Sequence, residues 1–337
     1  MEKYMVKKEK ILMLTTGGTI ASLSSEEGLA PGLVGIDLQK KVNYLLYDCY
    51  DVTVKDILHL DSSNIQPEEW VFIGQHVYDN ANDYDGIVIV HGTDTMAYTA
   101  SILSFMLRNI PIPVVLTGSQ LPLSHPLTDA YDNLRYAFAM AASKVPGIFL
   151  SFNRKIILGC RAVKVRTTGF DAFESVNYPL IGFVDSKGLN INKEVLVPPS
   201  GPFEYQSNLN TDVFLIKLTP GFNPKIFDML IEMNYKGVVI EAFGSGGLHF
   251  VNRNLIEKLK KLVESNVSVV VSSQCLYERS DLSIYQAGQM ALKQGVIPAY
   301  DMTTEAAVTK LSWALGQTSD MDEIRQIFKT NFVGEIS

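Results

Sequence analysis

The sequence predicts an α/β protein with a larger N-terminal, mostly parallel sheet that has helices on both faces, and a smaller C-terminal α/β domain. Short apolar runs alternate with segments of helical spacing along the 337 residues. Several of these runs are apolar throughout, which is typical of parallel strands buried on both faces. A stretch rich in Pro, Gly, Ser and Asn, Val197–Asn210, interrupts the alternation. We therefore predict domains over 1–196 and 212–337, joined by a linker over 197–211.

The N-terminal half begins with five apolar runs that predict strands at Ile11–Thr16, Val52–Leu60, Gly86–Val90, Pro113–Leu116 and Gly147–Phe152. Between them, apolar residues recur three and four positions apart, which predicts helices. These helices are expected over Ile36–Leu46, from Pro67 onward, and over Met96–Leu107 and Asp129–Ala142. A proline and two acids suit the first turn of the second helix. The glycine-bounded segment Gly28–Gly35 predicts a loop.

The same alternation continues to the end of the chain. Two further strands are predicted at Lys155–Val165 and Tyr178–Val184, and three more follow the linker at Val213–Leu218, Val238–Ala242 and Val267–Val271. Helical spacing predicts the remaining helices at Pro224–Met233, Leu255–Glu264, Leu282–Lys293, Thr304–Leu315 and Met321–Phe328. Strands that alternate with helices again predict a parallel sheet in this second domain.

Composition and charge exclude several classes of function. Hydrophobic residues make up 47% of the chain and charged residues 19%, which excludes an intrinsically disordered protein. The net charge of −7 and the lack of a basic block argue against a nucleic-acid partner. Three widely spaced cysteines, Cys49, Cys160 and Cys275, favour a reducing compartment. The sequence contains neither a signal peptide nor a membrane span, so we expect a cytoplasmic protein.

Familiar cofactor and metal motifs are absent from the sequence. No GxGxxG follows a predicted strand, and neither GxxxxGK(S/T) nor HExxH occurs. The five histidines lack the spacing of metal ligands, and the GxSxG motif of many hydrolases is missing. We therefore expect neither a metal nor an organic cofactor.

Hydroxyl side chains stand beside glycines where three predicted strands end, at Thr16–Thr19, Gly92–Thr95 and Thr117–Ser119. The polar turn Asp61–Ser63 follows a fourth strand. Because the carboxyl ends of parallel strands meet at one edge of a sheet, we expect these segments to line one crevice. A threonine hydroxyl is a weak nucleophile and needs a base, for which a histidine or a desolvated lysine can serve.

Three residues near this crevice admit a structural as well as a functional interpretation. His91 precedes Thr93 by two residues, and we expect a packed, hydrogen-bonded histidine whose side chain points away from the crevice. Asp94 lies where a helix opens, so it can be an N-cap or a functional residue. The residue types alone leave the same two possibilities open for Thr93.

Two segments together resemble the signatures of the bacterial L-asparaginase family. They are Thr16–Ala21, near the N-terminus, and His91–Met96, about a quarter of the way along the chain. The resemblance continues through Asp61–Ser63, Thr117–Gln120 and Gly159–Lys164 and covers essentially the whole chain. Without a signal peptide, the chain is most similar to the cytoplasmic type I branch. The resemblance implies hydrolysis of the side-chain amide of L-asparagine, through a threonine acyl-enzyme, to L-aspartate and ammonia.

The resemblance also implies roles for four catalytic residues. Thr19 matches the nucleophilic threonine of the first signature, and Thr93 matches the second catalytic threonine. Lys164 matches the lysine that acts with this second threonine. Asp94 matches the acid that pairs with the lysine.

The substrate-binding residues follow from the same resemblance. The turn formed by Asp61, Ser62 and Ser63 matches the segment that holds the substrate's α-carboxylate, with Ser62 as the side-chain donor. Asp94 matches the residue that binds the α-ammonium, beside Thr93. The family further implies a small-molecule substrate and a homodimer or homotetramer.

One position departs from the family pattern, and several alternatives stay open. Members usually have a tyrosine in the loop after the first signature, where this chain has Leu29, so the group that activates the nucleophile is undetermined.

The alternative functions to an L-asparaginase are a glutaminase-asparaginase of mixed specificity, the amidase subunit of a tRNA-dependent amidotransferase, an enzyme acting on D-amino acids or other amides, and a non-catalytic amino-acid-binding sensor. The acidic charge and the early first strand count against the amidotransferase. Thr19, Thr93 and Lys164 together favour an enzyme over a sensor.

Overall fold

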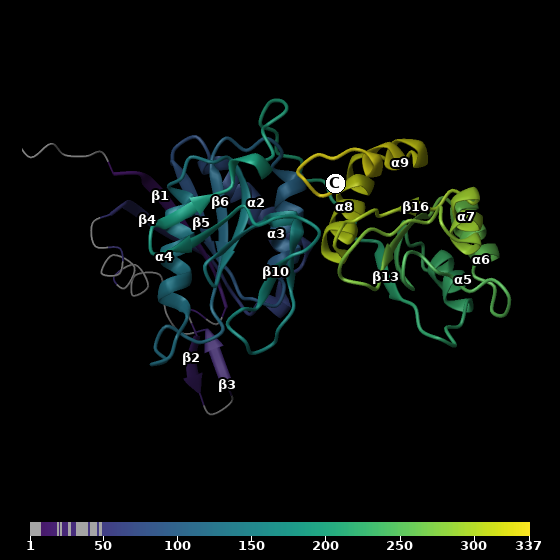
Figure 1. Ribbon diagram of the computed structural model, residues 1–337, viewed down its shortest axis with the longest axis horizontal. Helices are drawn as coiled ribbons and strands as arrows, with labels where there is room; N and C mark the ends of the chain where they lie inside the picture. Colours follow the sequence, from purple (N-terminus) through teal and green to yellow (C-terminus); the bar gives the residue numbers. More distant parts are fainter. Residues whose placement is uncertain are drawn as a thin grey trace, which may run out of the picture. The chain divides into compact units, whose positions relative to one another are not determined.

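The computed structural model describes residues 8–18, 20, 22–25, 28–31, 40, 46 and 49–337. The chain forms two compact units, one comprising Met1–Ser175 and Pro179–Tyr205 and the other Val176–Tyr178 and Gln206–Ser337. Each unit has its own main sheet, and helices pack on both of its faces (Figure 1). The predicted α/β fold, with a larger and a smaller sheet, is confirmed. The predicted helix Ile36–Leu46 lies almost entirely outside the described residues.

An eight-stranded sheet forms the first unit, in the order β12-β11-β8-β7-β6-β5-β1-β4. Five of its strands run parallel: β1 (Lys10–Gly17), β4 (Asp51–Leu60), β5 (Gly86–Val90), β6 (Pro113–Thr117) and β7 (Gly147–Phe152). Three antiparallel strands extend it beyond β7: β8 (Lys155–Leu158), β11 (Gly182–Asp185) and β12 (Gly188–Ile191). Every residue of β5 and β6 is buried, so both faces of the sheet are covered there.

The helices of this unit are α2 (Pro67–Asn80), α3 (Met96–Met106) and α4 (Ala130–Ala141). In Figure 1, α4 lies on one side of the parallel strands, whereas α2 and α3 lie on the other. At the start of α2, Glu69 Oε2 accepts a hydrogen bond from the Gln66 N–H at 2.8 Å, which caps the helix. Helix α4 packs closely on β5, because a Cβ at Gly86 would come within 2.0 Å of the Ala141 carbonyl oxygen.

The predicted loop at Gly28–Gly35 is wrong for its first four residues. Strand β3 (Gly28–Pro31) pairs antiparallel with β2 (Ser22–Ser25) in a two-stranded sheet, with Ser22 opposite Pro31. Glycine and proline suggested a loop, but a proline at the end of an edge strand costs no ladder hydrogen bond. Residues 32–35 lie outside the described part of the chain.

The single strand predicted at Lys155–Val165 is also wrong. Strand β8 ends at Leu158, a 3₁₀ turn (η3, Gly159–Arg161) follows, and β9 (Ala162–Lys164) pairs with β10 (Phe173–Ser175) in a separate two-stranded sheet. The chain turns where it meets α3, since a Cβ at Gly159 would lie 3.0 Å from Ser104 Oγ. Of the strand predicted at Tyr178–Val184, only the end belongs to a strand, β11.

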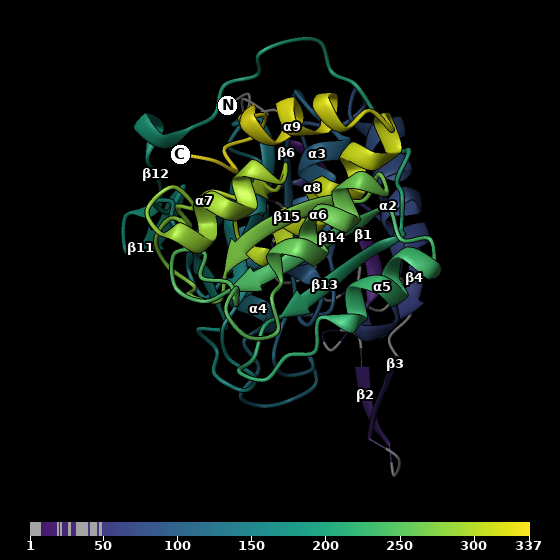
Figure 2. The same ribbon diagram turned by 90° about the vertical axis from the view of Figure 1, so that its right-hand side faces the viewer.

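The second unit contains a four-stranded parallel sheet in the order β13-β14-β15-β16, formed by Val213–Lys217, Gly237–Ala242, Ser268–Ser273 and Ile297–Pro298. Its helices are α5 (Lys225–Glu232), α6 (Ile256–Glu264), α7 (Gln286–Lys293), α8 (Thr304–Gln317) and α9 (Met321–Lys329). Helices α5, α6 and α7 cover one face, in front of the strands in Figure 2. Helix α8 packs against Gly237, where a Cβ would lie 2.8 Å from Leu311. Among the described residues, no helix is both long and apolar enough to cross a membrane.

Candidate active site

The carboxyl ends of four neighbouring strands lie side by side at one edge of the larger sheet. At the end of β1, the Thr16 hydroxyl donates to the Val90 carbonyl of β5 at 3.1 Å. The His91 N–H donates to the Thr117 carbonyl of β6 at 2.8 Å. The Gly18 N–H donates to the Leu60 carbonyl of β4 at 3.0 Å. These bonds bring the hydroxyl-bearing strand ends to one edge.

Two glycines allow the two signature segments to touch through their backbones. Gly18 has a φ of +78°, and a Cβ there would lie 2.6 Å from the Cα of Gly92. A Cβ at Gly92 would in turn lie 2.6 Å from Ser62 Oγ. Only glycine fits such approaches without displacing its neighbours. The proposed nucleophile, Thr19, follows Gly18 and lies outside the described residues.

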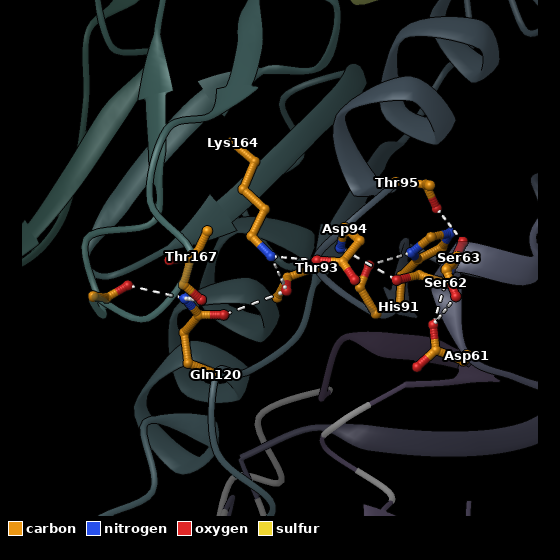
Figure 3. Close-up of polar contacts among 12 residues, drawn as sticks. Asp61, Ser62, Ser63, His91, Thr93, Asp94, Thr95, Gln120, Lys164 and Thr167 are labelled. Atoms are coloured by element: carbon orange, nitrogen blue, oxygen red, sulfur yellow. Dashed lines mark hydrogen bonds and ion pairs between the residues drawn. The ribbon is translucent and has the colours of Figure 1, made fainter. Parts of the chain in front are cut away.

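Lys164 joins the second signature through two hydrogen bonds (Figure 3). Its ammonium Nζ donates to Thr93 Oγ1 at 2.8 Å and to Asp94 Oδ1 at 2.5 Å. Lys164 ends strand β9 and is 71 residues from Thr93 along the chain. The Lys164 side chain is 17% exposed and that of Asp94 is 62% exposed. A lysine, a hydroxyl and a carboxylate therefore lie together at the edge of the sheet where the parallel strands have their carboxyl ends.

The structure also distinguishes the two interpretations of Asp94. The N-cap of α3 is Thr95, and no side chain caps the helix there. The Asp94 carboxylate instead forms the ion pair with Lys164. The N-cap interpretation of Asp94 is therefore wrong.

The turn Asp61–Ser63 lies next to this group and is held by its own hydrogen bonds. Asp61 Oδ1 accepts from the Ser63 N–H at 2.8 Å and from the Ser63 hydroxyl at 2.6 Å, and both bonds lower the pKa of the Asp61 carboxyl. Ser62 Oγ accepts from the Asp94 N–H at 3.2 Å, and the Ser62 carbonyl accepts from the Thr95 hydroxyl at 2.7 Å. Ser62 is therefore bonded to the second signature, and its hydroxyl hydrogen can be donated to an anion.

His91 has the packed, hydrogen-bonded environment that the sequence predicts. The residue is fully buried, with Nδ1 2.7 Å from the Gly92 carbonyl oxygen and Nε2 3.0 Å from the Thr99 hydroxyl. A carbonyl only accepts, so Nδ1 carries the hydrogen and Nε2 accepts from Thr99. Burial lowers the pKa of His91 to about 4. The imidazole is therefore neutral near pH 7 and fixes the backbone at Gly92.

One residue that sequence reasoning did not single out also touches this group. Gln120 follows β6, and its Oε1 accepts from the Thr93 hydroxyl at 3.3 Å (Figure 3). Its position in a Gly- and Ser-containing segment at a strand end was the available signal. Leu29, which stands where family members usually have a tyrosine, lies in β3 opposite Ser24. Among the described residues, no three His, Cys, Asp or Glu side chains are grouped to hold a metal ion.

Two family models match this chain, one for each half. The model described as "Asparaginase, N-terminal" matches residues 10–196, and "Glutaminase/Asparaginase C-terminal domain" matches residues 212–328. The chain belongs to the asparaginase/glutaminase family. The predicted family is thereby confirmed at this level.

Relatives within the family carry different names. An L-asparaginase from Thermococcus kodakarensis is 45% identical over 97% of this chain and 99% of its own, and the thermostable L-asparaginase structure from that organism has a TM-score of 0.90. L-asparaginase I from Vibrio cholerae is 30% identical with a TM-score of 0.88, covering 98% of this chain and 100% of its own. A component of the glutamyl-tRNA(Gln) amidotransferase from Methanosphaera stadtmanae is 35% identical over 99% of this chain and 78% of its own. The predicted restriction to bacterial members is not supported, since both Thermococcus and Methanosphaera are archaea.

Proposed function

We propose that this member of the asparaginase family is an L-asparaginase that hydrolyses the side-chain amide of L-asparagine to L-aspartate and ammonia. The observation that carries the proposal is the pair of contacts from Lys164 Nζ to Thr93 Oγ1 and to Asp94 Oδ1. A lysine in contact with a hydroxyl can relay a proton in acyl transfer, and a nearby carboxylate can keep it oriented. The 45% identical L-asparaginase of T. kodakarensis supports the same reaction.

The residues around this contact suit a small zwitterion. Asp94 is open to solvent, and its carboxylate can bind the α-ammonium of a free amino acid while Oδ1 contacts Lys164. Ser62 can donate its hydroxyl hydrogen to the α-carboxylate, beside the turn that Asp61 and Ser63 stabilise. One anion site and one cation site fix the amino-acid end, so the side-chain amide is directed toward the threonines.

In the first half-reaction, Thr19 is the proposed nucleophile, a role that rests on the family resemblance. Its Oγ forms a bond to the amide carbon, and its hydroxyl proton passes to the leaving nitrogen. The C–N bond then breaks, ammonia departs and an ester remains on the threonine. The negative charge on the carbonyl oxygen needs fixed donors, for which the backbone N–H groups of the Thr93 turn are candidates. One such donor contributes about 3–4 kcal/mol to the transition state.

In the second half-reaction, water attacks the ester. Thr93 Oγ1 can take the proton that water loses while its own hydroxyl proton passes to Lys164 Nζ, 2.8 Å away, and the lysine must enter this step as the neutral amine. The bond between the acyl carbon and Thr19 then breaks, its oxygen regains a proton, and L-aspartate is released. Whether Thr93 activates the nucleophile, the water or both is a question for single-turnover kinetics.

The test is ammonia release from purified protein given L-asparagine, L-glutamine and D-asparagine separately. We expect release from L-asparagine that is lost in Thr19→Ala and in Thr93→Val, with the melting temperature preserved in both variants. Full activity of Thr19→Ala would refute the assigned nucleophile. No release by the wild-type protein, with L-asparagine raising its melting temperature, would indicate an amino-acid sensor.

The glutamine reaction tests the second candidate, a glutaminase-asparaginase of mixed specificity. The match to a glutamyl-tRNA(Gln) amidotransferase component is the observation that favours it, because family members have diverged in function. Asparagine and glutamine differ by one methylene, which a pocket distinguishes by only about 1–3 kcal/mol. Our proposal includes a cytoplasmic location. It also includes a homodimer or homotetramer, and light scattering at several protein concentrations would test this oligomeric state.

A further inference from the structure

We propose that Thr99 is a positioning residue that, through His91, sets the direction of the Thr93 N–H. The inference rests on the proposed function, in which backbone N–H groups of the Thr93 turn stabilise the negative charge on the substrate's carbonyl oxygen. Thr99 lies on α3 and His91 follows β5, and both are fully buried. Because neither side chain is open to a substrate, any effect on the reaction must pass through the backbone.

A chain of three hydrogen bonds fixes the His91 ring at both of its nitrogens. The Trp70 indole N–H donates to Thr99 Oγ1 at 3.2 Å, and the Thr99 hydroxyl lies 3.0 Å from His91 Nε2. His91 Nδ1 lies 2.7 Å from the Gly92 carbonyl oxygen, which can only accept. A neutral imidazole has one ring hydrogen, so this hydrogen is on Nδ1 and Thr99 donates to Nε2. Each member of the chain therefore donates to the next, from α2 to the second signature.

The peptide between Gly92 and Thr93 is the part of the site that needs such a restraint. A glycine is required at position 92, because a Cβ there would lie 2.6 Å from Ser62 Oγ. Glycine has no side chain to limit the rotation of its backbone, so this peptide is intrinsically freer to turn than its neighbours. The hydrogen bond from His91 Nδ1 to the Gly92 carbonyl supplies the missing restraint.

The direction of the Gly92 carbonyl determines that of the Thr93 N–H. The described part of the chain contains no cis peptide bond, and in a trans peptide the C=O and the N–H point in opposite directions. The Gly92 carbonyl points to the buried His91 ring, so the Thr93 N–H points away from it. The Asp94 N–H is occupied by Ser62 Oγ, whereas the Thr93 N–H has no acceptor among the described residues. Since a buried N–H needs a partner, this one is available to a ligand oxygen.

Removal of the Thr99 hydroxyl would leave the buried Nε2 of His91 without a donor. The ring could then turn about its side-chain bonds, and the Gly92 carbonyl would lose its fixed partner. The peptide would adopt other orientations, in which the Thr93 N–H no longer faces the reacting carbonyl. The transition state needs this donor more than the bound substrate does, because the negative charge develops only there. The proposed role therefore predicts a loss of kcat with little change in KM.

The experiment compares Thr99→Val, which keeps the shape of the side chain without its hydroxyl, with Thr99→Ser, which keeps the hydroxyl. A matched control is Thr309→Val, because Thr309 is also fully buried in a helix and donates to the Glu305 carbonyl of α8. The measured quantities are kcat and KM for L-asparagine, the Kd of L-aspartate and the melting temperature. Loss of one such donor lowers kcat about 100- to 1000-fold and a misaligned donor loses part of this, so we expect a fall of about 10-fold for Thr99→Val. The KM and the Kd, as well as the kcat of Thr99→Ser and of the control, stay within about 2-fold of the wild type.

The nitrogen NMR spectrum of the His91 ring gives a second readout that does not depend on turnover. In the wild type, we expect the hydrogen on Nδ1 and a hydrogen-bonded, unprotonated Nε2. In Thr99→Val, the Nε2 resonance should move to the position of a nitrogen that accepts no hydrogen bond. A wild-type ring with its hydrogen on Nε2 would overturn the inference, because Nδ1 could not then donate to the Gly92 carbonyl.

Other outcomes also overturn it. If Thr99→Val keeps kcat within about 2-fold of the wild type, Thr99 does not position the donor. If KM and the Kd of L-aspartate rise as much as kcat falls, the residue shapes the binding site instead. If Thr99→Ser is as impaired as Thr99→Val, or if kcat falls only in proportion to the unfolded fraction, the hydroxyl has no positioning role. A wild-type protein with the hydrogen on Nδ1 that releases no ammonia would instead refute the proposed function, so the two failures are distinguishable.

Discussion

His91 provides a prediction whose magnitude can be worked out from the structure. Its ring is fully buried, and both nitrogens are already used, by the Gly92 carbonyl and the Thr99 hydroxyl. A second ring proton would have to displace the hydrogen that Thr99 donates. We therefore expect acidification to destabilise the folded protein through this residue, without His91 taking part in proton transfer near pH 7.

The sign and size follow from the two pKa values. The unfolded chain binds a proton at His91 near the ordinary pKa of 6.5, whereas burial lowers the pKa in the folded state to about 4. Between these values the unfolded state binds more protons, so the stability that is present above pH 6.5 is lost as the pH falls toward 4. This difference corresponds to about 3 kcal/mol of unfolding free energy.

Two measurements test this prediction. In an NMR titration of the histidine rings, the resonance that disappears in His91→Gln should stay in its neutral position until about pH 4 or until the protein unfolds. In urea unfolding, the stability difference between the wild type and His91→Gln should shrink by about 3 kcal/mol from neutral pH to about pH 4. Gln75→Met, which changes no titratable group, controls for other effects of pH on both states. A His91 resonance that titrates near 6.5 would refute the reasoning.

Three further predictions concern other contacts. Lys164→Met should lower kcat about 10²- to 10⁴-fold, because Thr93 loses its proton partner; near-normal turnover in steady-state assays would contradict this. Gly92→Ala puts a methyl group 2.6 Å from Ser62 Oγ, and displacing that hydroxyl should raise the KM for L-asparagine about 10-fold, with a smaller effect on kcat. Lys310 and Glu335 form an ion pair at 2.5 Å with both side chains fully buried. Lys310→Met should therefore cost about 3–5 kcal/mol in urea unfolding, and a loss below about 1 kcal/mol would show that the pair matters little.

The central strands could be predicted from the sequence because their residues are apolar throughout, as expected for strands buried on both faces of a sheet. Strands β5 and β6 are apolar from end to end, and every one of their residues is buried. The edge strands β10 and β12 are three and four residues long and are only partly buried. Each pairs with a strand close by in the chain, β9 or β11, but neither contains a run of apolar residues, so a pattern of burial could not reveal them. The split of the strand at Gly159 likewise depends on how closely helix α3 approaches it.

The site was predictable in part for a related reason. Parallel strands bring their carboxyl ends to one edge, so the proximity of the first two signatures followed from the topology. Nothing local in the sequence indicates that Lys164 meets Thr93, because a 3₁₀ turn and a short two-stranded sheet direct it there from 71 residues away. Resemblance to a family supplied that pairing. Gln120 was missed since its side chain reaches Thr93 through a loop whose path only the structure gives.

Exposure divides the proposed catalytic group into an enclosed and an open part. Thr93 is 6% exposed and the Lys164 side chain 17%, whereas the Asp94 side chain is 62% exposed. Electrostatic interactions are stronger where water is excluded, so the hydroxyl–ammonium contact lies where a proton transfer gains most from fixed partners. The open carboxylate, by contrast, can exchange water for the ammonium group of a ligand at a small desolvation cost. Asp94 can therefore orient Lys164 from one side and select a free amino acid from the other, a division of labour that suits an amidase acting on a zwitterionic substrate.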